Sequence, residues 1–318
     1  MTPSKDFSNL RPDQQGDLLR SDPEAYANLV SGITAYGIYL LNPDGRIQSW
    51  NAGAEKISGI SPREALGQPY QILFSRQSQL DRIPEKTLDY VRANQHVHDE
   101  QSRQHRRGDE YIAEVTLDSV RRSSGALMGF VEVMQDVTEA RQKQNALYRQ
   151  ATRDAMTGIF NRGHFTEMAN QEIERARRFA EPLSVVMLDI DHFKKVNDSY
   201  GHDVGDQAII ALARCCEAEI RKIDFVGRLG GEEFAILQPR AAKQPALEMA
   251  NRLRMKIAEI RIPLPSGYRT NVLSYTASLG VATLQPHTEG IQELLKNADN
   301  ALYQSKKEGR NKVSAWFE

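Results

Sequence analysis

Acidic residues stand at two places where strands are expected to end or turn. Asp189 and Asp191 close the apolar run LSVVMLDID, and Glu232 and Glu233 follow a glycine pair in RLGGEEF. Alternation along a strand puts Asp189 and Asp191 on one face and Ile190 on the other. The glycines let backbone and ligand approach the turn closely. If the two strands are neighbours, Asp189 and Glu232 converge.

Converging carboxylates without Cys or His ligands favour a hard cation, Mg²⁺ or Mn²⁺, over zinc. Lys194, Lys306 and Arg310 can supply positive charge nearby. A hard metal beside such cations suits phosphoryl or nucleotidyl transfer. Each feature alone has a simpler explanation, since an acid at a strand end is commonly a solvated turn residue and lysines at a helix end compensate the helix dipole. Their joint occurrence favours a catalytic site over these simpler explanations.

A second charged pair lies just upstream of the glycine turn. Arg221 and Asp224 form an R-x-x-D pattern, with five residues between Asp224 and Gly230. The planar fork of Arg can hold a phosphate, and Asp can accept hydrogen bonds from N–H groups. The structural alternative is a surface ion pair at i,i+3 spacing, which is common and weak.

Length and composition set the frame for these motifs. A chain of 318 residues with 40% hydrophobic residues is expected to form two folded domains. A net charge of -1 argues against a dedicated nucleic-acid binder. Without a signal-peptide core or an apolar run long enough to span a bilayer, we expect a soluble, cytoplasmic protein with no transmembrane segment. The neighbouring Cys215 and Cys216 are interpreted as buried thiols.

The first half of the chain alternates strand and helix signals. The stretch GIYLLNPDGRIQSWN predicts a hairpin, with a turn at Asn42-Pro43-Asp44-Gly45 and a second strand after it. Short helices are predicted at 52–57, at 62–66 with Ser61 as N-cap, and at 84–93. Strands are predicted at 97–105, 110–121 and 127–136, separated by glycine turns.

This order of elements resembles a PAS sensor domain over about Tyr26 to Thr138. The resemblance rests on NPDGRIQSWNAGAEKISGISPREALGQ, RRGDEYIAEVTLDSVRRSSGALMGF and QDVTEARQ. It implies an antiparallel sheet with flanking helices. The helical segment RIPEKTLDYVRANQ contains no histidine, and His96 and His98 follow on a strand, so haem is disfavoured. The region lacks cysteine, which excludes a flavin–cysteine adduct; a noncovalent flavin, a small metabolite or no ligand remain open.

A heptad-like pattern follows the last of these strands. Apolar and small residues step by 4, 3, 4, 3 and 4 along the chain, at Val133, Val137, Ala140, Gln144, Leu147 and Ala151. This spacing predicts a coiled-coil seam, with an ordinary amphipathic linker helix as the alternative. The polar Gln144 and the small alanines make the seam weak, which suits a helix pair that changes register.

The second half of the chain predicts helices packed on a sheet. Helices are expected at about 163–179, in AIIALARCCEAEIRK, in ALEMANRLRMKIAEI and in GIQELLKNADNALYQSKKEGRN. Strands are expected in LSVVMLDID and LSYTASLGVATL, and DFVGRLGGEEFAIL predicts a hairpin with the glycines at its turn. Asp154 and Arg162 flank a turn and are expected to pair as a structural hinge.

The chain from about Asp154 to Glu318 resembles a GGDEF domain, the diguanylate cyclase family. Five blocks carry the resemblance: DAMTGIFNR, DIDHFKKVNDSYGHDVGDQAI, RLGGEEF, SLGVA and ALYQSKKEGRN. It implies a palm-like α/β domain related to nucleotidyl cyclases. It also implies a reaction that joins two GTP into cyclic di-GMP with loss of two pyrophosphates. The signature is Gly-Gly-Glu-Glu-Phe rather than Gly-Gly-Asp-Glu-Phe, which keeps the charge.

The resemblance implies a role for each matching residue. A divalent metal would be held by Asp189, the Ile190 carbonyl and Glu232. Catalysis would involve Glu232, Glu233 and Lys194. GTP would be bound by Asn197, His202, Asp206, Lys306 and Arg310. Product would inhibit at Arg221 and Asp224. For His202, a loop-fixing role is an equal alternative.

The combined expectation is a two-domain α+β protein that acts as a homodimer, because each GGDEF domain holds one GTP. The expected layout is a leader at 1–24, a PAS domain at 25–137, a helical linker at 138–153 and a GGDEF domain at 154–318. The PAS domain would regulate the cyclase by shifting dimer arrangements. The rival function is a degenerate domain that only binds GTP or cyclic di-GMP as an effector. Retention of the acidic residues argues against this rival.

Overall fold

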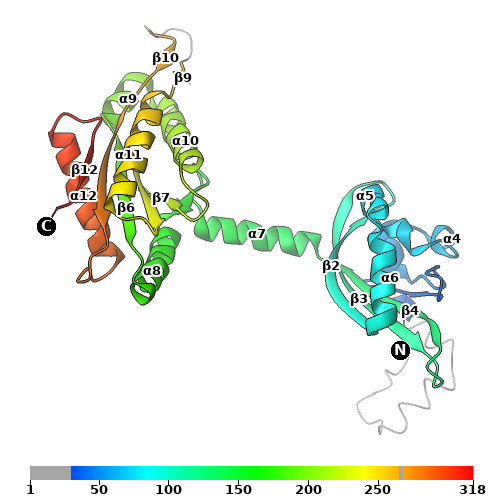
Figure 1. Cartoon of the computed structure of the whole chain (residues 1–318). Coiled ribbons are helices and arrows are strands. Elements are labelled where there is room, and N and C mark those ends of the chain that lie inside the picture. The colour runs from blue at the N-terminus through cyan, green and yellow to red at the C-terminus, as the bar shows by residue number, and fades with distance from the viewer. Residues whose placement is uncertain (1–29, 265–267, 269, 318) are drawn as a thin grey trace, which may run out of the picture. The chain divides into compact units, whose positions relative to one another are not determined.

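The computed structural model describes residues 30–264, 268 and 270–317, and the predicted leader at 1–24 lies outside them. The chain divides into two compact units between Gln144 and Asn145. Each unit combines helices with one main sheet, so the predicted two-domain α+β class is confirmed (Figure 1).

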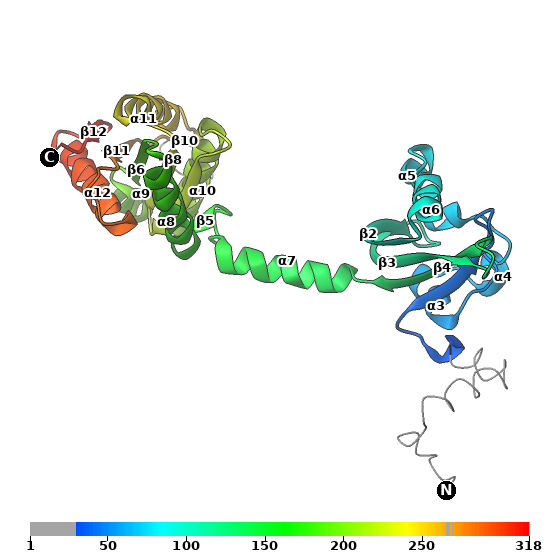
Figure 2. The same ribbon diagram turned by 60° about the horizontal axis from the view of Figure 1, so that its bottom comes forward.

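The N-terminal unit is built on a four-stranded antiparallel sheet with the order β1-β4-β3-β2 (Figure 2). Its strands are β1 (Gly37–Leu41), β2 (His96–Gln104), β3 (Glu110–Arg121) and β4 (Leu127–Asp136). Its helices are α3 (Ala52–Ser58), α4 (Pro62–Ala65), the 3₁₀ turn η1 (Tyr70–Leu73), α5 (Arg76–Leu80) and α6 (Ile83–Asn94). The three later strands and three helices expected from the sequence are therefore confirmed to within about a residue. The turn η1 and helix α5 were not predicted.

The predicted hairpin at the start of this unit is only partly formed. Asn42 N–H donates to the Arg46 carbonyl at 2.8 Å, so the turn is present. Its second arm, however, makes only an isolated bridge between Leu41 and Ile47, and the sheet neighbour of β1 is β4. The reason lies at Asn51, whose Oδ1 accepts from Ala54 N–H at 2.8 Å and caps α3. The chain turns into the helix before a second strand can extend.

The core of the N-terminal unit encloses a polar cluster that the sequence analysis missed. Arg103 and Glu132 are both fully buried. The hydroxyls of Tyr39 and Tyr70 donate to the Glu132 carboxylate. Arg103 Nη2 donates to the Tyr70 hydroxyl at 2.6 Å and to Glu132 at 3.2 Å, and its guanidinium lies 3.8 Å from the centre of the Phe74 ring. Burial raises the pKa of both tyrosines, which keeps them protonated as donors.

Helix α7 (Thr138–Thr152) follows β4. It begins at Thr138, whose backbone N–H donates to the Asp136 carboxylate at 2.9 Å and whose hydroxyl accepts from Ile112 N–H at 2.8 Å. The predicted seam cannot start at Val133, because that residue belongs to β4, where it pairs with Ile38 and Thr116. The apolar part of the helix is exposed, with Leu147 at 66%.

The C-terminal unit contains a mixed six-stranded sheet with the order β12-β11-β6-β8-β7-β5. The strands are β5 (Phe160–Asn161), β6 (Leu183–Ile190), β7 (Phe225–Gly230), β8 (Glu233–Pro239), β11 (Ala277–Thr283) and β12 (Val313–Ala315). Its helices are α8 (Arg162–Phe179), α9 (Phe193–Tyr200), α10 (His202–Glu219), α11 (Lys243–Ala258) and α12 (Ile291–Lys307). A small two-stranded sheet joins β9 (Ile262–Pro263) to β10 (Val272–Leu273). The long helices, the central strands and the β7–β8 hairpin match the sequence prediction.

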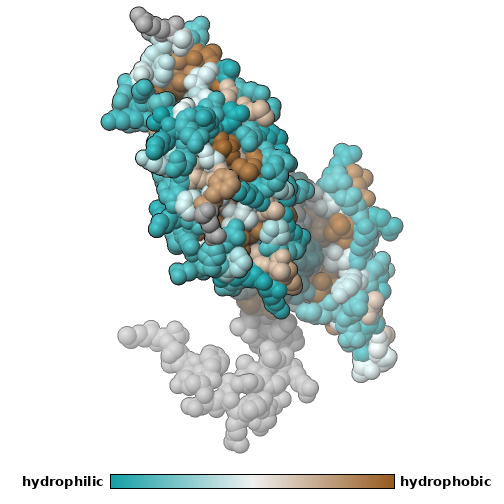
Figure 3. Space-filling model, turned by 60° about the vertical axis from the view of Figure 1, so that its left-hand side comes forward, coloured by the Kyte–Doolittle hydropathy of each residue, from teal (hydrophilic) through white to brown (hydrophobic). Residues whose placement is uncertain are grey.

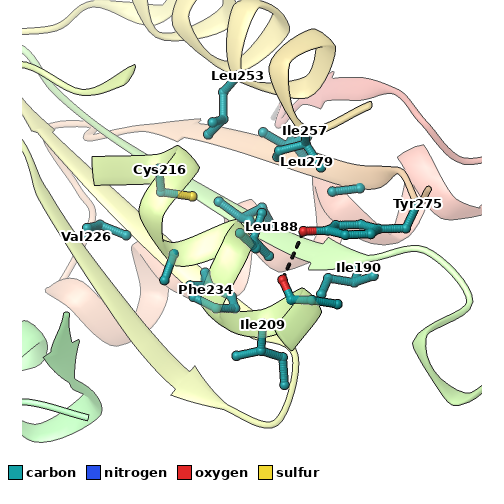
Figure 4. Packing of buried hydrophobic residues seen from close by; sticks show 14 of the residues in the cluster. Leu188, Ile190, Ile209, Cys216, Val226, Phe234, Leu253, Ile257, Tyr275 and Leu279 are labelled. Carbon is teal, nitrogen blue, oxygen red and sulfur yellow. Dashed lines mark hydrogen bonds between the residues drawn. The ribbon is translucent and has the colours of Figure 1, made fainter. Parts of the chain in front are cut away.

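Strand β6 is buried along its whole length and separates two apolar layers. Val186, Leu188 and Ile190 face the layer formed with α10 and α11 (Figure 4), and alternate β6 residues face α8 and α12. In the first layer Tyr275 donates to the Ala208 carbonyl at 2.9 Å. Cys216 is buried in the same layer, which raises the pKa of its thiol, whereas Cys215 is only partly buried. A central strand held on both faces gives the residues at its end fixed positions.

Among the described residues, no helix is both long and apolar enough to cross a membrane. The face shown in Figure 3 is mostly hydrophilic, with apolar residues in separate patches.

Candidate functional site

Asp189 is the residue around which the acidic site is built. It lies near the end of β6, opposite Glu233 on β8 and opposite Ser278 on β11. The strands that carry the two acidic motifs are therefore neighbours, which is the condition under which Asp189 and Glu232 were expected to converge. The Asp189 side chain is only 9% exposed, and Lys306 Nζ lies 2.8 Å from its Oδ2. A nearly buried carboxylate thus shares the end of the central strand with a cation from α12.

The electrostatics of Asp189 favour an additional positive charge. Burial raises its pKa to about 6, and the negative charges of Glu232 and Glu233 act in the same direction. Lys306 opposes the rise by its hydrogen bond and charge but does not cancel it. The available donors are carboxylates and the Ile190 carbonyl, which are oxygen ligands of the kind that Mg²⁺ and Mn²⁺ prefer. These residues therefore fit a hard divalent cation.

The glycine turn brings the second acidic motif to the same edge. Glu232 occupies the turn between β7 and β8, and Glu233 begins β8. Gly231 has a φ of 41°, a left-handed conformation that glycine adopts without strain. The pairing register shifts between Arg228 and Gly230, which turns the hairpin tip out of the regular ladder. Glu232 is half-buried and Glu233 is exposed.

The predicted base-binding residues lie where α9 meets α10. A Cβ on Gly205 would come within 1.9 Å of Asn197 Oδ1, so a larger residue at this position would displace the Asn197 side chain. Asn197 Oδ1 is buried and has no hydrogen-bond partner among the described residues. Asp206 follows Gly205 and is half-buried, and His202 is exposed at the first turn of α10. Lys194 is exposed on α9.

The predicted phosphate-binding residues lie at the end of α12. This helix packs on β6 and β11, which places Lys306 against Asp189. The chain then turns through Arg310 and Asn311, whose φ angles of 64° and 48° are both left-handed. Arg310 N–H donates to the Ser305 carbonyl at 3.0 Å, and its side chain is exposed.

Asp191 lies on the same face as Asp189, as alternation predicted, because its carboxylate contacts Ser278, the residue that pairs with Asp189. Its oxygens, however, are occupied by protein donors. They accept from the hydroxyls of Thr276 at 2.7 Å and Ser278 at 2.6 Å, and from Asn311 N–H at 2.9 Å. The three donors lie 85, 87 and 120 residues away, which is why sequence spacing could not indicate them.

Asp154 was expected to pair with Arg162, and this expectation is wrong. Its carboxylate accepts from Arg228 Nη1 at 3.0 Å and from the Thr157 hydroxyl at 2.7 Å. Strand β5 pairs with β7, which brings Arg228 next to the Asp154 turn. The partner is therefore supplied by the sheet rather than by the following helix.

Arg221 and Asp224 contact each other directly. Arg221 Nη2 donates to Asp224 Oδ1 at 2.8 Å, and Arg221 Nε donates to Oδ2 at 3.1 Å. The Asp224 side chain is fully buried, whereas Arg221 is 49% exposed. Both residues line two cavities, one of 360 Å³ that also includes Arg153 and one of 180 Å³ that also includes Arg252. Arg221 and Asp224 therefore form an i,i+3 ion pair, which the sequence offered as the alternative to a ligand site. Two cavities lie next to this ion pair.

Comparisons with known proteins agree with this architecture. The family model "Diguanylate cyclase, GGDEF domain" matches residues 151–312, and the model "PAS domain" matches residues 35–139. The chain is 38% identical over 187 residues to "Probable diguanylate cyclase DgcC" of Escherichia coli, which covers 59% of this chain and 49% of that protein. It is 37% identical over 163 residues to "Response regulator PleD" of Caulobacter vibrioides, which covers 51% of this chain and 36% of that protein.

Solved structures add a match in three dimensions. The coiled coil and GGDEF domain of DgcB from Caulobacter crescentus, in complex with c-di-GMP, aligns with a TM-score of 0.53 and 31% identity. The alignment covers 56% of this chain and 93% of that chain. The matched region spans about half the length, or less, of the curated relatives DgcC, DgcM and PleD. Because the GGDEF model matches just over half of its residues, this chain belongs to the diguanylate cyclase GGDEF-domain family and carries a PAS domain on the N-terminal side.

Proposed function

We propose that this protein condenses two GTP into cyclic di-GMP and two pyrophosphates, with two C-terminal units facing each other in a homodimer. The observation that carries the proposal is the position of Asp189, at the end of the buried central strand, beside the GGEEF turn and 2.8 Å from Lys306. Curated relatives named as diguanylate cyclases, among them DgcC and DgcM of Escherichia coli, support the same activity. Each unit would supply one GTP to the shared reaction.

The acidic residues would hold the metal and prepare the nucleophile. Asp189, the Ile190 carbonyl and Glu232 would hold Mg²⁺ or Mn²⁺. When bound, the cation would lower the pKa of the attacking 3'-hydroxyl and neutralise charge on the α-phosphate. Glu232 would accept the hydroxyl proton, and Glu233 would support it from the start of β8.

The basic residues would hold the triphosphate. Lys194, exposed on α9, would stabilise charge that develops during phosphoryl transfer. Lys306 and Arg310 would bind the β- and γ-phosphates from the end of α12. In the described structure Lys306 is bonded to Asp189, so we propose that it exchanges this carboxylate for phosphate oxygens when GTP and metal arrive.

The junction of α9 and α10 would recognise the base. The Asp206 carboxylate would accept from the guanine N1–H and N2 amine, which adenine cannot offer together. The unpartnered Asn197 Oδ1 would accept from the same edge. His202, exposed beside them, would contact the substrate. This set of acceptors favours GTP over ATP.

Two forms of regulation complete the proposal. Cyclic di-GMP would bind at Arg221 and Asp224, next to the cavities that these residues line. Arg221 is half-exposed and can turn part of its guanidinium toward a guanine or phosphate. The PAS domain at 25–137 would act through the linker at 138–153 on the cyclase domain at 154–318. The PAS domain would bind a noncovalent flavin, a small metabolite or no ligand.

The decisive experiment is incubation of product-stripped protein with GTP and Mg²⁺, with the product identified by mass. We expect cyclic di-GMP from the wild-type chain, at least about 100-fold less from Asp189→Asn, and far less cyclic dinucleotide of any kind when ATP replaces GTP. A wild-type chain that binds GTP and makes no cyclic di-GMP would instead support the rival function of an effector-binding domain.

A further inference from the structure

Asp191 connects three segments at the edge of the proposed active site. Its side chain is nearly buried, with a residue exposure of 5%. It accepts hydrogen bonds from Thr276 just before β11, from Ser278 within β11, and from the backbone N–H of Asn311 beyond α12. Its own N–H donates to the Thr276 carbonyl at 2.8 Å. One carboxylate therefore joins the end of the central strand to the turn that carries Arg310.

The turn that Asp191 contacts is unfavourable by itself. Arg310 and Asn311 are consecutive non-glycine residues with left-handed backbone angles, a conformation that L-residues rarely adopt. Such a conformation persists when surrounding contacts impose it. The contacts here are the bond from Arg310 N–H to the Ser305 carbonyl, the bond from Asn311 N–H to Asp191, and a bond from Arg254 Nη1 on α11 to Asn311 Oδ1 at 2.9 Å. Of these, only the bond to Asp191 ties the turn to the end of β6.

We propose that Asp191 is a positioning residue for triphosphate binding. It holds the Arg310–Asn311 turn in its left-handed form, so that Arg310 leaves the end of α12 in the direction of the Asp189 site. This inference rests on the proposed function, because it takes Arg310 as a phosphate-binding residue. It assigns Asp191 neither metal binding nor proton transfer, since both carboxylate oxygens are already engaged by protein donors.

The two substitutions Asp191→Asn and Asp191→Ala separate positioning from chemistry. An Asn amide oxygen in place of Oδ2 can still accept from Asn311 N–H and the Thr276 hydroxyl, and the Ser278 hydroxyl can rotate to accept from the amide nitrogen. We therefore expect Asp191→Asn to keep the KM for GTP within about threefold of wild type. Asp191→Ala removes the acceptor and should raise KM about tenfold, the factor that corresponds to one lost hydrogen bond of about 1.4 kcal/mol, with a smaller change in kcat.

A control variant from the same strand tests for a general loss of stability. Ser184 is buried near the other end of β6, where its hydroxyl donates to the Ala241 carbonyl at 2.8 Å and contacts the Thr283 hydroxyl at 2.9 Å. Ser184→Ala should lower the unfolding temperature and leave the KM for GTP unchanged. If Ser184→Ala raises KM as much as Asp191→Ala, the effect of Asp191 is only structural and the inference is overturned.

A double-mutant cycle with Arg310 tests the route of the effect. If Asp191 acts through Arg310, the double variant Asp191→Ala/Arg310→Ala should have the same KM as Arg310→Ala alone. Additive effects would overturn the inference, as would an Asp191→Asn variant whose kcat falls as far as that of Asp191→Ala.

A binding measurement separates this inference from the proposed function. The equilibrium Kd for GTP in the presence of Mg²⁺ is measured for the same set of variants. If wild type binds GTP without making product, the proposed function fails and the Kd values still decide the role of Asp191. Absence of GTP binding overturns both.

Discussion

Replacing Glu132 with leucine should destabilise the N-terminal unit, because it leaves Arg103 buried without its carboxylate. Glu132 accepts from Tyr39, Tyr70 and Arg103, and both charged side chains are fully buried. Removal of one partner of a buried ion pair typically costs about 3–5 kcal/mol, because the remaining charge loses its compensation. The two phenols also lose their acceptor. We therefore expect a loss of about 4 kcal/mol in the free energy of unfolding.

The matched comparison is the double variant Arg103→Met/Glu132→Leu. Replacement of both charges by apolar side chains of similar volume is often neutral or stabilising. The two tyrosine hydroxyls remain without Glu132 and should cost about 1 kcal/mol each. The double variant is therefore expected to be about 2 kcal/mol more stable than Glu132→Leu alone.

Urea unfolding can follow this unit within the full chain. The protein has two tryptophans, and Trp50 lies in the N-terminal unit with its ring centre 4.8 Å from that of Tyr39. In a Trp316→Phe background its fluorescence reports this unit alone. With a urea dependence of about 2 kcal/mol per molar, a loss of 4 kcal/mol lowers the midpoint by about 2 M. A loss below about 1 kcal/mol for Glu132→Leu, or a double variant less stable than the single one, would refute the reasoning.

Further predictions concern pH, catalysis, specificity and feedback. Burial raises the pKa of Tyr39 and Tyr70 above their usual value near 10, so their contribution to stability is complete below pH 10 and is lost as pH rises above it. Trp50 fluorescence should show alkaline unfolding above pH 10, and Tyr39→Phe should make that transition less steep. Asp189→Asn should lower kcat at least about 100-fold with normal circular dichroism, and full activity would exclude Asp189 as a metal ligand. Asp206→Asn should reduce the preference for GTP over ATP in kcat/KM about tenfold, and an unchanged ratio would remove Asp206 from base recognition. Arg221→Ala should weaken inhibition by added cyclic di-GMP while Arg221→Lys weakens it less, and identical inhibition curves would rule out a product site there.

Much of the architecture could be predicted because its signals are local. A short continuous apolar run identified β6, the glycine pair identified the β7–β8 turn, and helical periodicity identified α10, α11 and α12. The acidic residues of the site could be named because they stand where such elements end or turn. The second arm of the hairpin after β1 was predicted as a strand but makes only an isolated bridge, because its pairing depends on contacts that are not local. Its turn is local, but Asn51 caps α3 and the sheet edge of β1 is taken by β4.

Only the tertiary structure decided which polar groups meet. Arg103 and Glu132 are 29 residues apart, Asp154 and Arg228 are 74 apart, and Asp191 and Asn311 are 120 apart. Nothing in the spacing of these residues indicates contact, because strand pairing across the sheet and helix packing bring them together. The sequence by itself indicated most of the long helices and strands, the acidic motifs and the family. The fold determined that Asp189 meets Lys306, that Asp191 holds the turn after α12, and that a charge pair fills the N-terminal core, since burial and partner choice depend on contacts made far along the chain.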